Sequence, residues 1–322
     1  DGVCTLRAAL DEARVAGSPR VIALGNGRYV LDEPLELSGN VILLGNGPDK
    51  SFIHGQRLVT VGSTTLRMEG ISVSGGGLRA IAVDSLTLRR MRFTGNRIES
   101  SFGGAIQTDA PVLDIRDSTF DGNSSSTVDG GTLMCFSCSG IIENVTVSGG
   151  TGGGLTFTGS GNVTLNHVTL VGTGGGSGWS VPFGAALHVY DDMQISVGNS
   201  VIADNYSTGP ASDCAVGGNG VLISLGGNAL GQGNSCTGLR GAGTLLIDDA
   251  MLAPLAAGAD GLPVRLPAID SPLVDALPAS GCLATDARGL SRPRDGDEDG
   301  LALCDIGAVE RRVDGIFRSR FD

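Results

Sequence analysis

The chain has 322 residues, of which 53 are glycine, 41% are hydrophobic and only 4% are aromatic. Its formal net charge of −12, with Lys50 as the single lysine, argues against nucleic acid or an anionic membrane as a partner. The sequence contains no transmembrane segment, because no apolar run approaches the ~20 residues that a membrane-spanning helix needs.

The first predicted element is a short amphipathic helix, which Thr5 is placed to cap. Its apolar residues fall on one helical stripe, namely Leu6, Ala9, Leu10 and Ala13. A helix at the end of a repeat protein covers core and strand edges that would otherwise be exposed. We therefore predict that residues 1–19 form an N-terminal capping helix.

Residues 20–247 contain an internal repeat with a period of 20 to 32 residues. Each copy holds short alternating apolar runs, such as Val112–Ile115 and Val163–Asn166, and these runs are typical of strands. A unit of this size cannot bury its own apolar side, so the copies must stack on one another. We predict an all-β fold, a single-stranded parallel β-helix of about nine coils. At a strand spacing of ~4.8 Å these coils make a rod of roughly 45 Å.

Length changes are confined to one corner of the predicted coil. An apolar residue after a short glycine-rich run lies 17 or 18 residues before the next closing turn in five copies. These marker residues are Leu78, Ile106, Leu133, Leu155 and Leu187. The alternative fold, an antiparallel sandwich of many short strands, does not confine insertions to one corner and is disfavoured.

The turn that closes each coil carries asparagine in six of nine copies. Asparagine and glycine tolerate the positive φ that such a turn needs. Asparagine amides that stack in register can also hydrogen-bond along the rod. The predicted structural ladder consists of Asn26, Asn46, Asn96, Asn123, Asn205 and Asn228.

The longest insertion, which begins at Gly174, and the strand after it carry the richest candidate binding site. The candidate residues are Trp179, Phe183, Tyr190, Asp191 and Asp192. Insertions on one edge of a solenoid often form its binding face, so these residues predict a patch for a surface glycan or another partner. The alternative is a glycine-rich loop whose single tryptophan packs against the rod.

The seven cysteines of this acidic chain favour disulfides and an oxidising compartment. Two pairs each close a loop of about twenty residues, and we predict the disulfides Cys214–Cys236 and Cys282–Cys304. Cys135 and Cys138 form a CxxC motif, for which a local disulfide or two structural thiols are the open alternatives. A redox or zinc site is disfavoured, because neither a βαβ context nor a second ligand pair is visible. Cys4 is left without an assigned pairing.

From about Asp248 the repeat pattern ends. Residues 248–255 predict a short helix, and four prolines between residues 263 and 278 mark an irregular segment after it. We predict that residues 248–322 fold back as a C-terminal cap or anchor-type module.

An acidic turn in this segment has the spacing of a calcium-binding loop. Asp295, Asp297 and Asp299, followed by a glycine, place alternate carboxylates where they can converge on one ion. The position that normally holds glutamate is Ile306, and Asp305 is the candidate substitute. A Ca²⁺ site and a solvated acidic turn are the two alternatives.

Several motifs resemble known families. Residues 4–10, CTLRAAL, resemble the CSLREA-type opening of secreted bacterial β-helix proteins. Gly103–Ile106 and Phe120–Asn123 resemble the GGAI and FxxN repeats of polymorphic outer-membrane proteins. The tail, from Ser271 through Asp286 to the CDIGAVE motif at residues 304–310, resembles the C-terminal module of choice-of-anchor surface proteins.

This resemblance spans nearly the whole chain and implies an exported right-handed parallel β-helix. It implies no reaction, because such proteins are presumed to be structural or adhesive. The family has a strand before the CSLREA-like helix, whereas this sequence begins at Asp1. That strand is expected either to be cleaved off or to come from another subunit.

Three functions compete for this chain. A structural or adhesive protein, secreted or at the cell surface, predicts an extended rod without a pocket of perturbed carboxylates. A subunit of a homopolymeric extracellular filament predicts ends that pack against copies of the chain. A carbohydrate-active enzyme, either a polysaccharide lyase or a glycoside hydrolase, predicts Asp191 or Asp192 facing another acid across a groove. His167 and His188 are expected in strands, with no metal cluster around them. We favour the structural or adhesive function over the filament subunit.

Overall fold

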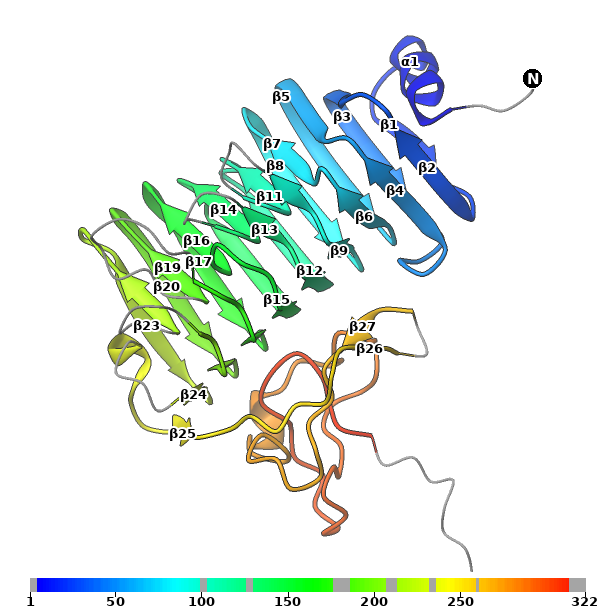
Figure 1. Cartoon of the computed structure of the whole chain (residues 1–322). Helices are drawn as coiled ribbons and strands as arrows, with labels where there is room; N and C mark the ends of the chain where they lie inside the picture. The colour runs from blue at the N-terminus through cyan, green and yellow to red at the C-terminus, as the bar shows by residue number, and fades with distance from the viewer. Residues whose placement is uncertain are drawn as a thin grey trace, which may run out of the picture.

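The structure, a computed structural model, describes residues 5–98, 103–125, 130–175, 186–206, 213–231, 236–258 and 261–312. Figure 1 shows a rod of stacked rungs, with α1 at its N-terminal end and an irregular C-terminal module beside its other half. The strands of the rod pair in parallel from one rung to the next, which confirms the predicted parallel β-helix.

Three faces make up the rod. The first face consists of β1 (Arg20–Ala23), β3 (Leu35–Leu44), β5 (Leu58–Glu69), β8 (Val83–Arg89), β12 (Leu113–Asp121), β15 (Gly140–Ser148), β17 (Ser160–Asn166), β20 (Asp192–Gly198) and β23 (Val221–Gly226). The second face consists of β2 (Gly27–Leu31), β4 (Ser51–Gly55), β6 (Ser72–Gly75), β9 (Arg92–Thr94), the ends of β12 and β15, β18 (Thr169–Val171), β21 (Val201–Ala203), β24 (Ala229–Gly231) and β25 (Leu245–Ile247). The third face consists of the starts of β3 and β5, β7 (Leu78–Ala80), β11 (Ile106–Thr108), β14 (Leu133–Phe136), β16 (Leu155–Thr158), β19 (Leu187–Val189) and β22 (Cys214–Val216).

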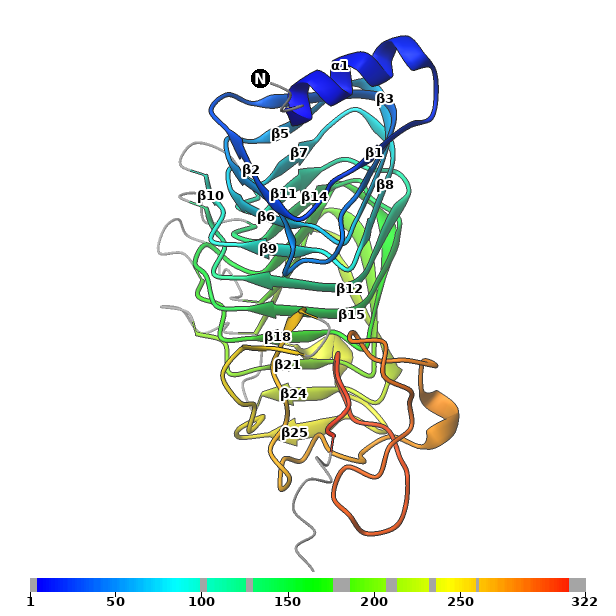
Figure 2. The same cartoon turned by 90° about the vertical axis from the view of Figure 1, so that its right-hand side faces the viewer.

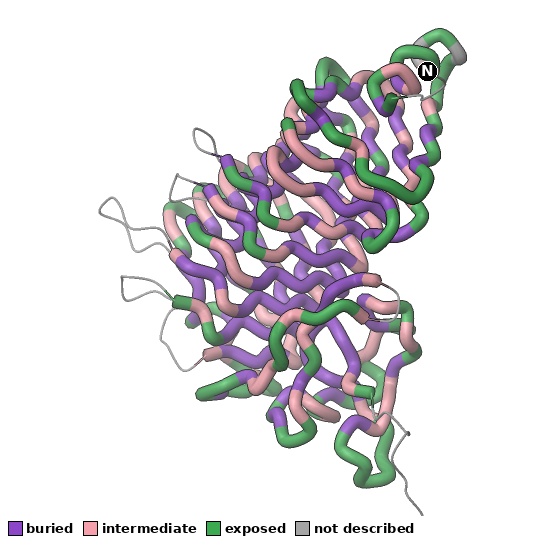
Figure 3. The backbone as a smooth tube through the Cα atoms, turned by 45° about the vertical axis from the view of Figure 1, so that its right-hand side comes forward, coloured by how far each residue is buried: buried purple, intermediate pink, exposed green. Residues whose placement is uncertain are grey.

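Columns of apolar side chains fill the inside of the rod. In the first face, register places Leu43, Met68 and Leu88 one above another, and all three are fully buried. In the second face, the rings of Phe93 and Phe120 stack with centroids 5.2 Å apart. Figure 3 shows buried residues recurring along every rung. Each rung therefore completes the core of its neighbours, as the repeat predicts.

The capping helix α1 (Leu6–Ala16) closes the N-terminal end of this core. The Thr5 hydroxyl oxygen accepts a hydrogen bond from the Ala8 N–H at 3.1 Å, which caps the helix as predicted. Leu6 and Leu10 are buried in the rod core, and Figure 2 shows the helix lying across the end.

The asparagines of the predicted ladder occupy two different corners. Register through β9 and β12, and through the short strands β10 (Arg97–Ile98) and β13 (Ser124–Ser125), places Asn96 and Asn123 in one column. This column continues through Gly150 and Thr173 to Asn205. The Nδ2 group of Asn96 donates to Oδ1 of Asn123 at 2.8 Å. A single column of six asparagines is therefore the wrong description.

The remaining three asparagines lie at the corner between the first and second faces. Asn46 donates to Asn26 at 2.9 Å. Asn228 accepts from the backbone N–H of Ser200, which occupies the same position one rung earlier. Both corners are tight turns rich in glycine and asparagine, so an alignment on the turn residue cannot tell them apart.

The reason for asparagine in the Asn96 column also differs from the prediction. Positive φ belongs to the residue before it, as at Gly95 (57°) and Gly122 (62°). The asparagine side chains are buried, and Asn123 Nδ2 donates to the Phe93 carbonyl at 2.9 Å. Asparagine is needed here because its amide satisfies backbone groups inside the turn.

The C-terminal module, residues 248–312, packs against the outside of the second face. It contains β26 (Ala256–Ala257), β27 (Pro263–Val264) and η2 (Ala279–Gly281). Val171 and Val201 point away from the rod core, yet they are buried in a cluster with Leu273 and Ile306 of the module. The predicted cap thus covers a side of the rod. At the last rung, the short helix η1 (Thr237–Leu239) lies next to β23.

The short helix predicted at residues 248–255 is wrong. Met251 has a φ of 50°, and its backbone N–H donates to Oδ1 of Asp249 at 2.7 Å. This side-chain hydrogen bond forms a local turn instead of a helix.

Candidate functional site

The predicted binding patch is only partly described. Trp179 and Phe183 lie outside the described residues. The Tyr190 ring lies against the next rung, since a Cβ at Gly217 would come within 2.7 Å of its Cδ1 atom. Tyr190 is therefore packed along the rod and does not project as a platform for a sugar.

Asp191 and Asp192 connect their corner to two different rungs. Asp191 has a φ of 55°, and its carboxylate accepts hydrogen bonds from the Thr158 hydroxyl and from the Gly159 N–H at 3.0 Å. These hydrogen bonds lower the pKa of Asp191. Asp192 Oδ1 accepts from Asn219 Nδ2 at 2.9 Å on the following rung. Both carboxylates thus stabilise the stacking of rungs.

The acidic turn of the module brings together a different set of carboxylates from the predicted one. Oxygen atoms of Asp275, Asp295 and Asp297 lie within 4.8 Å of one another. Asp275 also accepts from the backbone N–H of Gly296 at 2.7 Å, so it holds the turn in place. These three residues, with hard oxygen ligands, could approach one Ca²⁺ ion.

Asp299 and Asp305 are not part of this cluster. The Asp299 carboxylate accepts from the N–H of Leu301 at 2.8 Å. Asp305 is fully buried and accepts from the N–H of Asp275 at 2.9 Å. The chain turns away after the glycine of the loop, so the spacing of an EF-hand does not carry over to these two residues.

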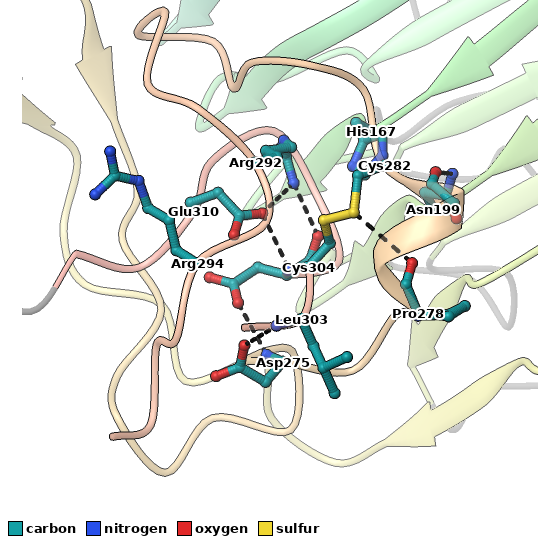
Figure 4. Close-up of a disulfide and its surroundings, with 12 residues drawn as sticks. His167, Asn199, Asp275, Pro278, Cys282, Arg292, Arg294, Leu303, Cys304 and Glu310 are labelled. Carbon is teal, nitrogen blue, oxygen red and sulfur yellow. Dashed lines mark hydrogen bonds and ion pairs between the residues drawn. A yellow bond between two sulfur atoms is a disulfide. The ribbon is translucent and has the colours of Figure 1, made fainter. Parts of the chain in front are cut away.

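A buried charge network lies at the centre of the module (Figure 4). Arg292 donates to the carbonyls of Asp305 at 3.0 Å and Gly307 at 2.8 Å, and it forms an ion pair with Glu310. Both side chains of that pair have 0% exposure. Asp286 accepts from the backbone N–H groups of Arg288 and Glu310, in addition to pairing with the Arg288 guanidinium.

Burial sets the protonation behaviour of this network. It raises the pKa of Glu310 to about 7, although the charge of Arg292 acts in the opposite direction. It lowers the pKa of His167 to about 3, and the Arg292 charge adds to this effect. His167 is therefore neutral at physiological pH. Sequence reasoning assigned the network no role, although Asp286 and residues 304–310 were prominent in the resemblance.

Three successive residues of one corner attach the module to the rod. Register places Asn144, His167 and Asn199 at the same position of consecutive rungs, each with φ near 50°. The Asn144 amide donates to the Thr285 carbonyl at 3.0 Å, and His167 Nδ1 lies 3.2 Å from the Gly307 carbonyl oxygen. The Asn199 amide donates to the carbonyl of Gly281 at 3.2 Å. This corner thus provides a row of polar side chains for docking.

The described residues form three disulfides, of which Cys214–Cys236 and Cys282–Cys304 have the predicted pairings. Cys214–Cys236 joins β22 to the segment that precedes η1, and Cys282–Cys304 crosses the module beside His167. The CxxC motif forms the local disulfide Cys135–Cys138, which lies in the rod core with both residues fully buried. Cys4 lies outside the described residues.

A cavity of about 780 Å³ lies between α1 and β2. Its lining includes Arg7, Arg28, Tyr29, Asp32 and Glu33. Among the described strands, β2 pairs only with β4, so the cavity borders an unpaired strand edge. No sequence pattern indicated this cavity, because it exists only where the helix crosses the first rung.

Comparison with known proteins gives little further information. No protein-family model and no curated protein matches the chain. A solved structure of a mutant PL6 family alginate lyase, AlyGC, is similar, with 14% sequence identity and a TM-score of 0.18. The alignment covers 82% of this chain and 55% of the lyase chain. At this TM-score the similarity carries no argument about activity. Within the described ranges, no helix is long and apolar enough to cross a membrane.

Proposed function

We propose that this chain is an exported, non-enzymatic structural or adhesive β-helix protein of the cell surface. One observation carries the proposal: a series of charged side chains on the first face of the rod is paired within and between rungs. Arg89 pairs with Asp114, which also pairs with Arg116, and Arg116 pairs in turn with Glu143. Asp191 and Asp192 bond to neighbouring rungs in the same way. Side chains used like this support a long rod and are not poised as an acid and a base.

The disulfides support export. Structural disulfides persist in oxidising compartments such as the outside of the cell. Three of them connect segments of the rod and of the module, and two of these enclose a separation of 22 residues each. A rod held in this way is suited to an environment without chaperones.

A filament subunit is the second candidate, and the last rung favours it. Among the described strands, β23 pairs only with β20 and β25 pairs only with β24, so each leaves one edge unpaired. Leu225 is 60% exposed and Leu246 is 50% exposed on these strands. Exposed apolar strand edges are templates for another chain, and because α1 covers the N-terminal end of the core, a second copy would add at the last rung.

Incubation with a panel of neutral and acidic polysaccharides tests the principal proposal. We expect no new reducing ends and no unsaturated products, even after long incubation at high protein concentration. Turnover of any polymer would establish the carbohydrate-active alternative instead. Electron microscopy of the native material distinguishes a single rod from a filament. In a filament, Leu225→Lys with Leu246→Lys should cause dissociation, whereas Val112→Lys on a middle rung should not.

A further inference from the structure

Two arginines lie together on the third face of the rod, near its N-terminal end. Arg57 occupies the turn before β5, and Arg79 is the central residue of β7. Register pairs Arg79 with Val59, two residues after Arg57. Arg57 Nε donates to the carbonyl of Gly76 at 3.0 Å, which directs its guanidinium group toward the rung that carries Arg79.

Neither arginine is neutralised within the described part of the chain. No ion pair involves Arg57 or Arg79 there, and Arg57 Nη2 is buried without a hydrogen-bond partner. Burial and the positive charge of Arg79 lower the pKa of Arg57 to about 10. A guanidinium group that is desolvated next to a like charge lacks the interactions that normally compensate for burial.

Three other arginines of the rod, in contrast, have a carboxylate partner. On the first face, Arg67 pairs with Glu69 and Arg89 pairs with Asp114. On the second face, Arg92 Nε donates to Asp121 at 3.0 Å. The chain carries 34 acidic residues and a net charge of −12, so carboxylates are plentiful. A pair of arginines that no described carboxylate neutralises is a candidate place for an anion supplied from outside.

We propose that Arg57 and Arg79 form a binding site for an oxyanion, supplied by carboxylate or sulfate groups of an acidic polysaccharide that contacts the rod at this local pair of positive charges, although the whole chain has a net charge of −12. Arginine presents its N–H groups in a planar fork that matches these anions with two parallel hydrogen bonds. Both arginine residues are partly exposed, so an anion can approach the pair from solvent, and Arg57 Nη2 is the donor that has no partner within the protein's described residues. The site extends the adhesive role proposed for the rod by giving it a class of ligand, but its existence does not depend on that role.

Thermal unfolding in millimolar sodium sulfate, with sodium chloride of equal ionic strength as the reference, tests the site itself. The variants are the double substitution Arg57→Gln with Arg79→Gln, and Arg67→Gln as a matched control on β5. Sulfate should raise the Tm of the wild type and of the control by mass action. The double variant should lose this response, and its Tm without sulfate should be higher than that of the wild type, because the like-charge repulsion is gone. An equal sulfate response in all three proteins would overturn the site.

Binding to dextran sulfate, carboxymethyl dextran and neutral dextran of equal length tests the ligand class. The wild type and the control should bind one or both charged polymers, and the double variant at least tenfold more weakly, a change of ~1.4 kcal/mol. Failure of both charged polymers to bind a sulfate-responsive protein would overturn the polysaccharide assignment. Cleavage of a bound polymer would leave the site intact and overturn only the proposed non-enzymatic function.

Discussion

Along the rod, Arg89 meets Asp114 on the next rung with the two side chains 33% and 25% exposed, whereas Arg292 and Glu310 of the module meet with 0% exposure. The first kind of pair is repeated with variations from rung to rung, so losing one leaves its neighbours in place. The second kind does not recur along a series of rungs, and Arg292 is also bonded to two backbone carbonyls. The two regions therefore hold their folds in different ways.

This difference has an energetic consequence. Water screens a partly exposed pair, and such pairs contribute little to stability. A buried charge whose partner is removed keeps its full desolvation cost. Single charge changes should therefore be tolerated by the rod and should damage the module.

The largest expected effect comes from Arg292→Met. It removes the ion-pair partner of the buried Glu310 and one of the groups that contact the Gly307 carbonyl, and we expect a loss of ~3–5 kcal/mol in the unfolding free energy. Arg89→Met on the rod is the matched control, with an expected loss of ~0–1 kcal/mol. Urea denaturation measures both, and limited proteolysis shows whether the module separates first. Equal losses for the two variants would remove the distinction between the regions.

The two disulfides with a separation of 22 residues form the next comparison, since one joins the end of the rod and the other crosses the module. Chain entropy predicts a similar loss of about 3 kcal/mol when either is removed. We expect Cys282→Ser with Cys304→Ser to lose more than Cys214→Ser with Cys236→Ser, because only the former disturbs the docking of the module. Calorimetry of the two double variants measures the difference. A larger loss for the rod pair would contradict this expectation.

Asn123→Ala tests a buried position of the rod. It removes the acceptor for Asn96 and the donor for the Phe93 carbonyl, and we expect a loss of ~1–3 kcal/mol. Asn219→Ala, an exposed position that also bonds to a neighbouring rung, should change stability by less than ~0.5 kcal/mol. If the two variants unfold at the same denaturant concentration, the buried asparagine column is not what stabilises this corner.

The last comparison concerns the dependence of stability on pH. The pKa of His167 is lowered to about 3 in the folded state, so between about pH 6.5 and pH 3 the unfolded chain binds the extra proton and stability falls as the pH falls. The slope from this residue is ~1.4 kcal/mol per pH unit. The pKa of Glu310 is raised from 4.5 to about 7 in the folded state, so between these pH values the folded chain binds the extra proton. The stability contributed by Glu310 therefore falls as the pH rises through this range.

Comparing wild type with His167→Gln separates these two contributions. The variant should lack the fall in unfolding free energy that His167 causes below about pH 6.5. The difference in unfolding free energy between the wild type and the variant should therefore shrink as the pH is lowered. Unfolding free energies at pH 7, 5.5 and 4 provide the measurement. A constant difference across this range would show that His167 titrates normally in the folded protein.

Much of the rod could be predicted from the sequence, because a repeat imposes the same local pattern on every rung. Alternating residues such as Leu113 and Ile115 become core positions, and Leu6 and Leu10 mark a helix that covers the end. The pairings Cys214–Cys236 and Cys282–Cys304 were predicted from the sequence, whereas the CxxC motif could equally have held two thiols. The two corners could not be separated, because Asn46 and Asn123 occur in similar turn sequences while their registers differ.

The sequence by itself determined a stacked, disulfide-linked rod, since periodic apolar residues and tight turns leave a short unit no other way to bury its core. Only the tertiary structure decided where the module docks, which carboxylates meet in its acidic turn, and that Arg57 and Arg79 lie side by side. These contacts join residues that are distant in the sequence or that share no repeated pattern. Their positions depend on register and on packing against a face of the rod, which local residue preferences do not encode.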